Sequence, residues 1–431
     1  MNSSKTEDAP QRHRGTETKN RVLSLCLCAS VVNLLYSSAP ASAQLAIRGE
    51  TVYTMVGAPI KDGVVLIEAQ KIVKVGPADT VTIPDGVKTL TAKVVTPGLI
   101  DAHSVVGLTG YLNQDQDQDQ LDASEPIQPE LRAIDSYNAQ ERLIEWVRGF
   151  GVTTLHTGHA PGALISGQTM IVKTTGNTVE DAVINPTAMV ACTLGEDARA
   201  KGKDAEKKSP GTRSKAIAML RAQLIKAQEY QRKLELPDEK KRPDRDLRLE
   251  TMTRVLKGEL PLLVTVHRAT DIVSALRVAG EFKIKIVLDG AAESYLVMDQ
   301  IKAAGVPVII HPTMTRTGRG ETENLSMESA ATLIKAGIPV ALQSGYEDYV
   351  PKTRIALFEA AIAAANGLTF EQALGTITID AAKMLGISDR VGSLEPGKDA
   401  DVALYDGDPF EYTTHCTGVV INGQVVSSET R

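Results

Sequence analysis

Three residues with catalytic side chains each follow a short apolar run. His103 closes the run that begins at Leu99, His267 follows Leu262–Val266, and Asp289 follows Leu288. Imidazole and carboxylate groups transfer protons and bind divalent metals such as zinc. If the apolar runs are parallel strands of one sheet, their carboxyl ends meet at one edge, where α/β folds place their sites. We therefore expect these three side chains to converge.

Further ionisable residues follow other apolar runs, and each has a structural alternative. Lys173 ends the run that begins at Ile165, and His311 follows Val306–Ile310. A lysine at a strand end commonly extends its amine into solvent. His156 and His159 flank a glycine after another run, at a spacing that fits either a metal or ordinary hydrogen bonds. Lys173 and His311 are weaker site candidates than the three residues above.

The elements that must position these residues alternate between strand-like and helix-like patterns. Apolar, β-branched runs occur near residues 262–266, 284–290, 306–311 and 338–345, with helix-length segments between them. Apolar residues at helical spacing also predict helices over 132–150 and 214–236. This alternation is typical of βα units. It predicts an α/β fold with a (β/α)8 TIM barrel over residues 96–391.

Both ends of the chain are rich in β-forming residues. Residues 44–95 contain several short apolar runs separated by turn residues, and residues 392–431 contain matching runs. Within the second segment, Asn422-Gly423 lies between two apolar runs, which is a strong hairpin signal. We expect the two segments to form one small β-sandwich beside the barrel.

Residues 1–43 have the pattern of an export signal. A basic segment precedes the apolar run Val22–Leu35, and Ala41-Ser42-Ala43 resembles a cleavage site. We expect a mature protein that starts near Gln44, has no membrane span, and lies in the periplasm or outside the cell. Cys192 and Cys416 would then remain, either as a disulfide or as two buried thiols.

The composition narrows the class of partner. The 431-residue chain is 42% hydrophobic and 23% charged, with a formal net charge of −6 and only 4% aromatic residues. Proteins that bind nucleic acids are usually basic, so we expect no nucleic-acid partner. A small-molecule substrate or ligand fits better, and association into a homo-oligomer stays open.

The stretch Val94–Gly107 contains the motif Pro-Gly-Leu-Ile-Asp-Ala-His, which resembles the first barrel strand of the amidohydrolase superfamily. Residues 392–401 and 165–173 also resemble segments of that superfamily, in its secreted, imidazolonepropionase-like branch. The resemblance implies a TIM barrel with a β-sandwich. It also implies a metal-dependent hydrolase that acts on C–N bonds of non-peptide or dipeptide-like substrates.

The sequence departs from the superfamily pattern at three site positions. Val105 stands where the second histidine of the first strand is expected, Asp289 replaces a histidine, and Gly345 replaces the proton-shuttling aspartate. The resemblance therefore leaves His103, His267 and Asp289 as ligands of a single zinc or similar divalent metal, or of no metal at all. It also makes Lys173, which some members carboxylate to bridge two metals, a weak candidate.

Two functions follow from this incomplete ligand set. The first is a hydrolase of the superfamily whose activity is weak or absent. The alternative is a non-catalytic exported barrel that binds a small ligand or a partner protein. Resemblance to the superfamily favours the hydrolase only by analogy, because one fold can host many functions.

Overall fold

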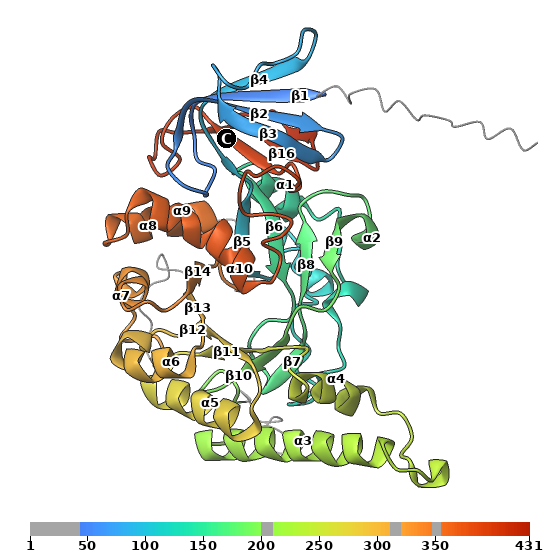
Figure 1. The fold of residues 1–431 in the computed structure, drawn as a ribbon. Coiled ribbons are helices and arrows are strands. Elements are labelled where there is room, and N and C mark those ends of the chain that lie inside the picture. Colours follow the sequence, from blue (N-terminus) through green and yellow to red (C-terminus); the bar gives the residue numbers. More distant parts are fainter. Residues whose placement is uncertain (1–43, 200–209, 311–319, 347–354) are drawn as a thin grey trace, which may run out of the picture. The chain divides into compact units, whose positions relative to one another are not determined.

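The computed structural model describes residues 44–199, 210–310, 320–346 and 355–431 (Figure 1). The expected export signal lies outside this part of the chain, and so does His311. Within the described ranges, we find no helix that is both long and apolar enough to cross a membrane.

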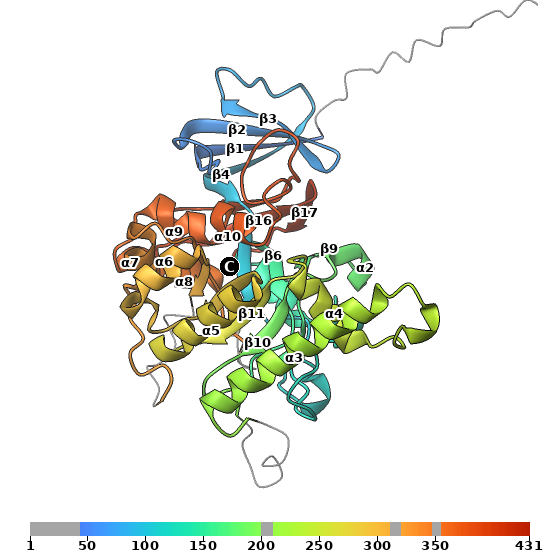
Figure 2. The ribbon, with the colours of Figure 1, turned by 60° about the horizontal axis from the view of Figure 1, so that its bottom comes forward.

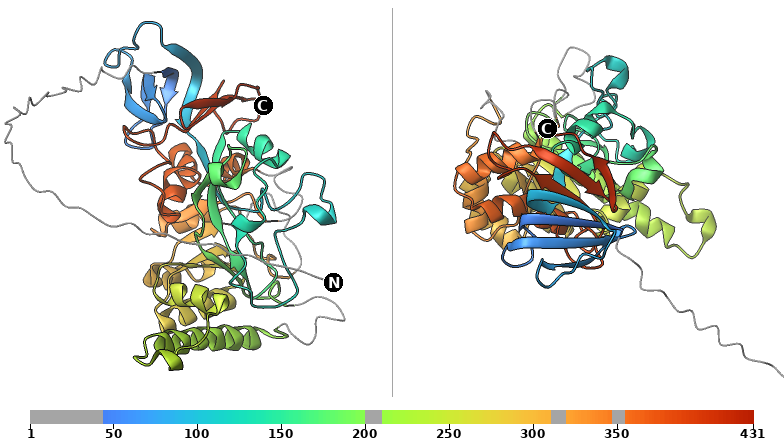
Figure 3. Two further views of the ribbon diagram at one scale, coloured as in Figure 1. Left: turned by 90° about the vertical axis from the view of Figure 1, so that its right-hand side faces the viewer. Right: turned by 90° about the horizontal axis from the view of Figure 1, so that it is seen from above.

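Strands from both ends of the chain form one sheet of seven strands, in the order β17-β16-β15-β4-β1-β2-β3. Figure 3 shows the N-terminal strands in blue and the C-terminal strands in red within this sheet. The strands are β1 (Leu45–Val52), β2 (Ile60–Glu68), β3 (Lys71–Pro77), β4 (Lys88–Pro97), β15 (Val402–Tyr405), β16 (Cys416–Ile421) and β17 (Gln424–Ser427). The antiparallel pairing of β4 with β15 joins the two ends.

The predicted hairpin is confirmed between β16 and β17, which pair in antiparallel register. Its turn residues Asn422 and Gly423 have φ values of 51° and 73°. A two-residue hairpin turn of this kind needs positive φ at both positions, which asparagine and glycine tolerate best.

Two further sheets form the strands of the barrel. One has the order β14-β13-β12-β11-β10-β7 and the other β5-β6-β8-β9, and a bridge between Ser104 and Gly345 links β5 to the end of β14. Their strands are β5 (Leu99–Ser104), β6 (Val152–Thr157), β7 (Ile165–Gln168), β8 (Met170–Lys173), β9 (Val183–Asn185), β10 (Val190–Thr193), β11 (Leu262–Val266), β12 (Ile286–Gly290), β13 (Val308–Ile310) and β14 (Val340–Leu342). Only Thr169 separates β7 from β8, so the two sheets share one continuous stretch of chain.

The barrel differs from the expected all-parallel arrangement at this shared stretch. β8 pairs with β6, and β7 pairs with β10, in antiparallel directions. Only residues 158–164 connect β6 to β7. A parallel crossover needs about a dozen residues or more, usually with a helix, so this short connection returns the chain in the opposite direction.

Helices pack around the barrel strands, and α3 packs against both α4 and α5 (Figure 2). The helices are α1 (Arg142–Arg148), α2 (Val179–Ala182), α3 (Arg213–Leu234), α4 (Leu247–Leu256), α5 (Ala269–Phe282), α6 (Met298–Ala304), α7 (Ser329–Lys335), α8 (Ala356–Ala365), α9 (Phe370–Thr376) and α10 (Ile379–Met384). Short 3-10 turns occur at Asp115–Asp117, Ala133–Asp135, Glu239–Lys241 and Ser294–Leu296. The helix predicted over 214–236 is confirmed as α3, whereas that predicted over 132–150 was too long. The 3-10 turn and an Asn138 turn interrupt it before α1.

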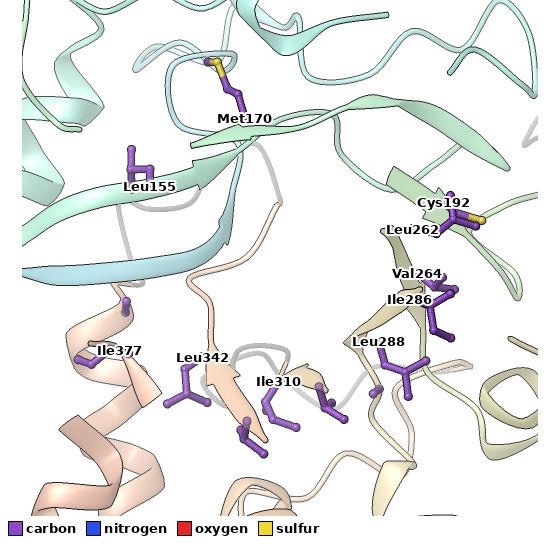
Figure 4. Close-up of a cluster of buried hydrophobic side chains, with 14 of the residues drawn as sticks. Leu155, Met170, Cys192, Leu262, Val264, Ile286, Leu288, Ile310, Leu342 and Ile377 are labelled. Carbon is purple, nitrogen blue, oxygen red and sulfur yellow. The ribbon is translucent and has the colours of Figure 1, made fainter. Parts of the chain in front are cut away.

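Alternation along each strand divides the core into two layers. One set of side chains packs between the strands and the outer helices, including Leu262, Val264, Leu288 and Leu342 (Figure 4). The intervening residues form a separate apolar cluster inside the barrel, which includes Ile100, Leu263, Val287, Ile309 and Ala341. Successive strand residues face opposite sides, so the residues two positions further along these strands also face the barrel interior.

Candidate functional site

A layer of polar residues follows the inner apolar cluster. Thr265 lies two residues after Leu263, and Asp289 lies two residues after Val287. Thr265 and Asp289 are aligned partners in the parallel register of β11 with β12. Gln343 directly follows β14, so three strands of one sheet bring a hydroxyl, a carboxylate and an amide to the barrel interior.

Asp289 is the centre of a buried hydrogen-bond network. Its Oδ2 accepts from the Thr265 hydroxyl at 2.6 Å, and its Oδ1 accepts from Nε2 of Gln343 at 2.7 Å. Nδ1 of His103 lies 3.1 Å from the same Oδ1. Hydrogen bonds donated to a carboxylate stabilise its ionised form. Both oxygens of Asp289 are therefore already engaged by side chains of the protein.

A register shift in β5 turns His103 toward Asp289. Ala102 belongs to the inner apolar cluster, yet the next residue, His103, also reaches the barrel interior. The pairing of β5 with β6 shifts between Asp101 and Ser104, as in a β-bulge. Such irregularities change which way a side chain points and are common beside functional sites.

His267 lies close to the same region and packs against the end of β12. A Cβ atom at Gly290 would lie only 2.6 Å from Cε1 of His267, so only glycine fits there. Nε2 of His267 lies 3.4 Å from the Tyr346 hydroxyl, and the Tyr346 ring centroid is 5.8 Å from that of His103. The structure thus places His103 and Asp289 in contact and connects His267 to this pair through Tyr346.

Asp101 is a buried acidic residue that the sequence reasoning did not include among the candidates. It accepts hydrogen bonds from the backbone N–H of Ser344 at 3.0 Å and from the Ser344 hydroxyl. Burial raises the pKa of the Asp101 carboxyl to about 6, against the opposing effect of these hydrogen bonds. Asp101 links β5, which carries His103, to the residues that follow β14, which include Gln343. Its position in the Pro-Gly-Leu-Ile-Asp motif is the sequence feature that could have identified Asp101 as a candidate.

The two histidines after β6 have different surroundings. Nδ1 of His156 donates to the Ala102 carbonyl and its Nε2 accepts from the Thr169 hydroxyl, both at 2.7 Å. Burial, with a smaller effect of nearby His103, lowers the pKa of His156 to about 3. This pattern makes His156 a neutral structural histidine. His159 packs against Gly167, and burial lowers its pKa to about 4.

Lys173 lies at a different place from the one expected of a metal-bridging or solvent-facing lysine. Its Nζ is 2.8 Å from an oxygen of Asp399 and 3.0 Å from one of Asp401, and the side chain is buried. The expectation that it reaches solvent was wrong, because the carboxylates of Asp399 and Asp401, just before β15, lie at the end of β8. These contacts also engage its amine away from the Asp289 network.

The described residues do not fit a two-metal centre. Val105 is buried and carries no ligand atom, and Gly345 has no side chain. Across the described ranges there is no group of three or more His, Cys, Asp or Glu side chains placed to hold a metal ion. The single-metal role of His103, His267 and Asp289 stays a prediction, as does that of His311, which lies outside the described residues.

Cys192 and Cys416 are both buried free thiols. Burial raises the pKa of each thiol to about 12. The alternative in which they form a disulfide is therefore not the one the structure adopts.

This combination of an α/β barrel with a composite β-domain matches the fold of a solved amidohydrolase structure. A family model described as the amidohydrolase family matches residues 268–427. The chain has a TM-score of 0.83 and 29% identity to the structure of an amidohydrolase from Thermotoga maritima, over 89% of this chain and 100% of the other.

Two of the sequence relatives are imidazolonepropionases. An imidazolonepropionase from Fusobacterium nucleatum is 24% identical over 85% of this chain and 91% of its own length. One from Shewanella frigidimarina is 47% identical, but over only 14% of this chain and 16% of its own length. The chain is therefore similar to amidohydrolases, and imidazolonepropionases are among its sequence relatives.

Proposed function

We propose that this protein is an amidohydrolase-superfamily member whose metal centre has lost ligands. It therefore hydrolyses ordinary substrates of the superfamily slowly or not at all. Its ancestral chemistry is hydrolysis of C–N bonds in non-peptide or dipeptide-like molecules. The observation that carries this proposal is Asp289. It stands where the superfamily has a metal-binding histidine, and its two oxygens accept hydrogen bonds from Thr265, Gln343 and His103.

Two further positions support the loss of the usual chemistry. In the superfamily, metal polarises the scissile carbonyl and activates a water molecule, and an aspartate transfers the proton. Val105 removes a ligand from the first strand, and Gly345 removes that aspartate. Gly345 has φ +109°, a conformation that L-residues rarely adopt. Restoring an aspartate there would therefore strain the backbone.

The alternative function is non-catalytic binding of a small ligand in the barrel. It is favoured by the same network, which presents fixed polar groups in a buried site without the proton-transfer aspartate. The two functions differ in whether product forms, so a hydrolysis screen distinguishes them.

The experiment uses the purified protein with a panel of N-acyl amino acids, dipeptides and cyclic amides, with and without added zinc. We expect turnover close to the uncatalysed rate in every case. The matched variant is Val105→His with Asp289→His, which restores two histidine ligands and leaves Gly345 unchanged. Metal binding that rises in this variant over the parent supports the proposal. Rapid hydrolysis by the parent, abolished by a chelator, contradicts it.

We also propose that the mature protein starts near Gln44 and acts in the periplasm or outside the cell. The support is the basic, apolar and Ala-Ser-Ala succession in residues 1–43. N-terminal sequencing of protein from an expressing cell tests this. A cytosolic product that retains Met1 is the contradictory result.

A further inference from the structure

Two buried atoms, on side chains that contact Asp289, have no hydrogen-bond partner among the described residues. They are Nε2 of His103 and Oε1 of Gln343, and both side chains are fully buried. Buried polar atoms in native proteins almost always have a partner, so an unpartnered pair at one place needs an explanation.

The chemical character of both atoms is set by Asp289. An ionised carboxylate only accepts hydrogen bonds, so the Gln343 amide must direct its NH2 toward Asp289 and keep its oxygen for another partner. Nδ1 of His103 must likewise carry the proton that Asp289 accepts. In the neutral imidazole, Nε2 is then an acceptor. The donors of both side chains meet on one oxygen, Oδ1, at 2.7 and 3.1 Å, so their remaining acceptors belong to a single locality.

With no metal bound, this locality attracts groups of the opposite kind from those that a metal-loaded centre attracts. A metal cation attracts the carbonyl oxygen of a substrate, whereas two acceptors beside a carboxylate attract N–H groups and positive charge. We infer that the barrel interior binds a small ligand through a group with at least two N–H donors, of the amidinium, guanidinium or primary ammonium class. The inference rests on the proposed loss of the two-metal centre and adds the class of ligand that replaces it.

The test compares two probes of the same shape and opposite chemistry. Acetamidinium offers N–H donors and a positive charge, whereas acetate offers only acceptors and a negative charge. Binding to the purified protein is measured for each by ligand-observed NMR and calorimetry. We expect acetamidinium to bind at least tenfold more tightly than acetate.

Variants then locate the site. Gln343→Leu removes one acceptor, and Asp289→Asn removes the carboxylate that orients both, so each should weaken acetamidinium binding tenfold or more. Thr253→Val changes a buried hydroxyl that also lacks a partner among the described residues but lies on α4, and it should leave binding unchanged. Circular dichroism shows which variants fold, and the comparison of probes on the parent protein needs no variant.

Several results would overturn the inference. These are equal or tighter binding of acetate, no binding of acetamidinium because the acceptors hold water only, and acetamidinium binding that survives both substitutions. Elemental analysis of the same sample distinguishes an error in the inferred ligand class from an error in the proposed function. Failed binding in a protein without two metals rejects only the ligand class, whereas two bound metals reject the proposed function itself.

Discussion

At the scale of single residues, Asp289 decides the character of the site. A histidine at this position would offer one lone pair to a metal, whereas Asp289 accepts donors from three elements of the barrel. Removing one donor leaves a buried carboxylate less well compensated. Hydrogen bonds to a charged group contribute more to stability than hydrogen bonds between neutral groups. The loss of one donor to Asp289 is therefore measurable as a change in the free energy of unfolding.

Thr265→Val tests this network with a side chain of the same shape. The substitution removes the hydroxyl that lies 2.6 Å from Asp289, and we expect it to lower the free energy of unfolding by about 1.5–3 kcal/mol. Thr253→Val is the control, because its buried hydroxyl has no partner among the described residues. Urea denaturation of both variants measures the difference. Equal effects would show that the Thr265 contact contributes nothing specific.

His156 gives a prediction for the dependence of stability on pH. Burial lowers its folded pKa from the ordinary 6.5 to about 3. Below pH 6.5 the unfolded chain therefore binds a proton that the folded protein does not. The stability that His156 contributes is complete above pH 6.5 and is lost as the pH falls toward 3, by about 2 kcal/mol at pH 5.

The measurement is urea denaturation between pH 7 and pH 5, for the parent and for His156→Gln. Glutamine retains a donor for the Ala102 carbonyl and an acceptor for the Thr169 hydroxyl, but it does not titrate. We expect the variant to lose less stability than the parent over this range. An unchanged pH dependence would mean that His156 is protonated in the folded protein or that its share is negligible.

At the scale of elements, Lys173 joins the barrel to the composite sheet. It extends from β8 to Asp399 and Asp401 just before β15, and Lys71 of β3 binds Asp399 from the other side at 2.6 Å. Burial alone would raise the pKa of Asp399. The hydrogen bonds from Lys173 and Lys71 instead hold it at about 2. The two ends of the chain and the barrel thus share one ionic cluster.

Lys173→Met should break this cluster. Removing one partner of a buried ion pair leaves an uncompensated charge, so we expect a loss of about 3–5 kcal/mol in the free energy of unfolding. Lys71→Met is the matched control, because its side chain is 49% exposed and binds the same carboxylate. Its loss should be about 1 kcal/mol or less. Thermal denaturation measures both, and similar losses would contradict the account.

Elements that depend on local sequence were predictable. Asn422-Gly423 identified the β16–β17 hairpin, and helical periodicity identified α3, because both are determined by nearby residues. The reversed direction of β7 and β8 was missed, since it depends on the short connection 158–164 rather than on a pattern within the strands. The burial of Lys173 was missed because its partners are more than two hundred residues away.

The candidate site was predictable in position but not in bonding. The strand-end pattern and the family motif indicated His103 and Asp289 as site residues, and the structure places them in contact. Their relationship depends on the register shift in β5 and on Gln343, which no local pattern marks as a partner. A single sequence could not show that the oxygens of Asp289 are already occupied.

At the scale of the whole molecule, the proposed function separates fold from chemistry. The chain keeps the fold of the Thermotoga maritima amidohydrolase over 89% of its length, whereas Val105, Asp289 and Gly345 depart from the residue types that the superfamily resemblance implies at its site. A barrel tolerates such changes, because its stability comes mainly from the apolar layers, and its function comes from a few strand-end residues. Similarity to the superfamily therefore does not establish catalysis here.

The most direct test of this account is the metal content of the purified protein, measured by elemental analysis after incubation with zinc and removal of the excess. We predict no more than one weakly held metal per chain and no chelator-sensitive amide hydrolysis. Two metals per chain together with rapid, chelator-sensitive hydrolysis would contradict it, and would show that residues other than Val105 and Gly345 have rebuilt the centre.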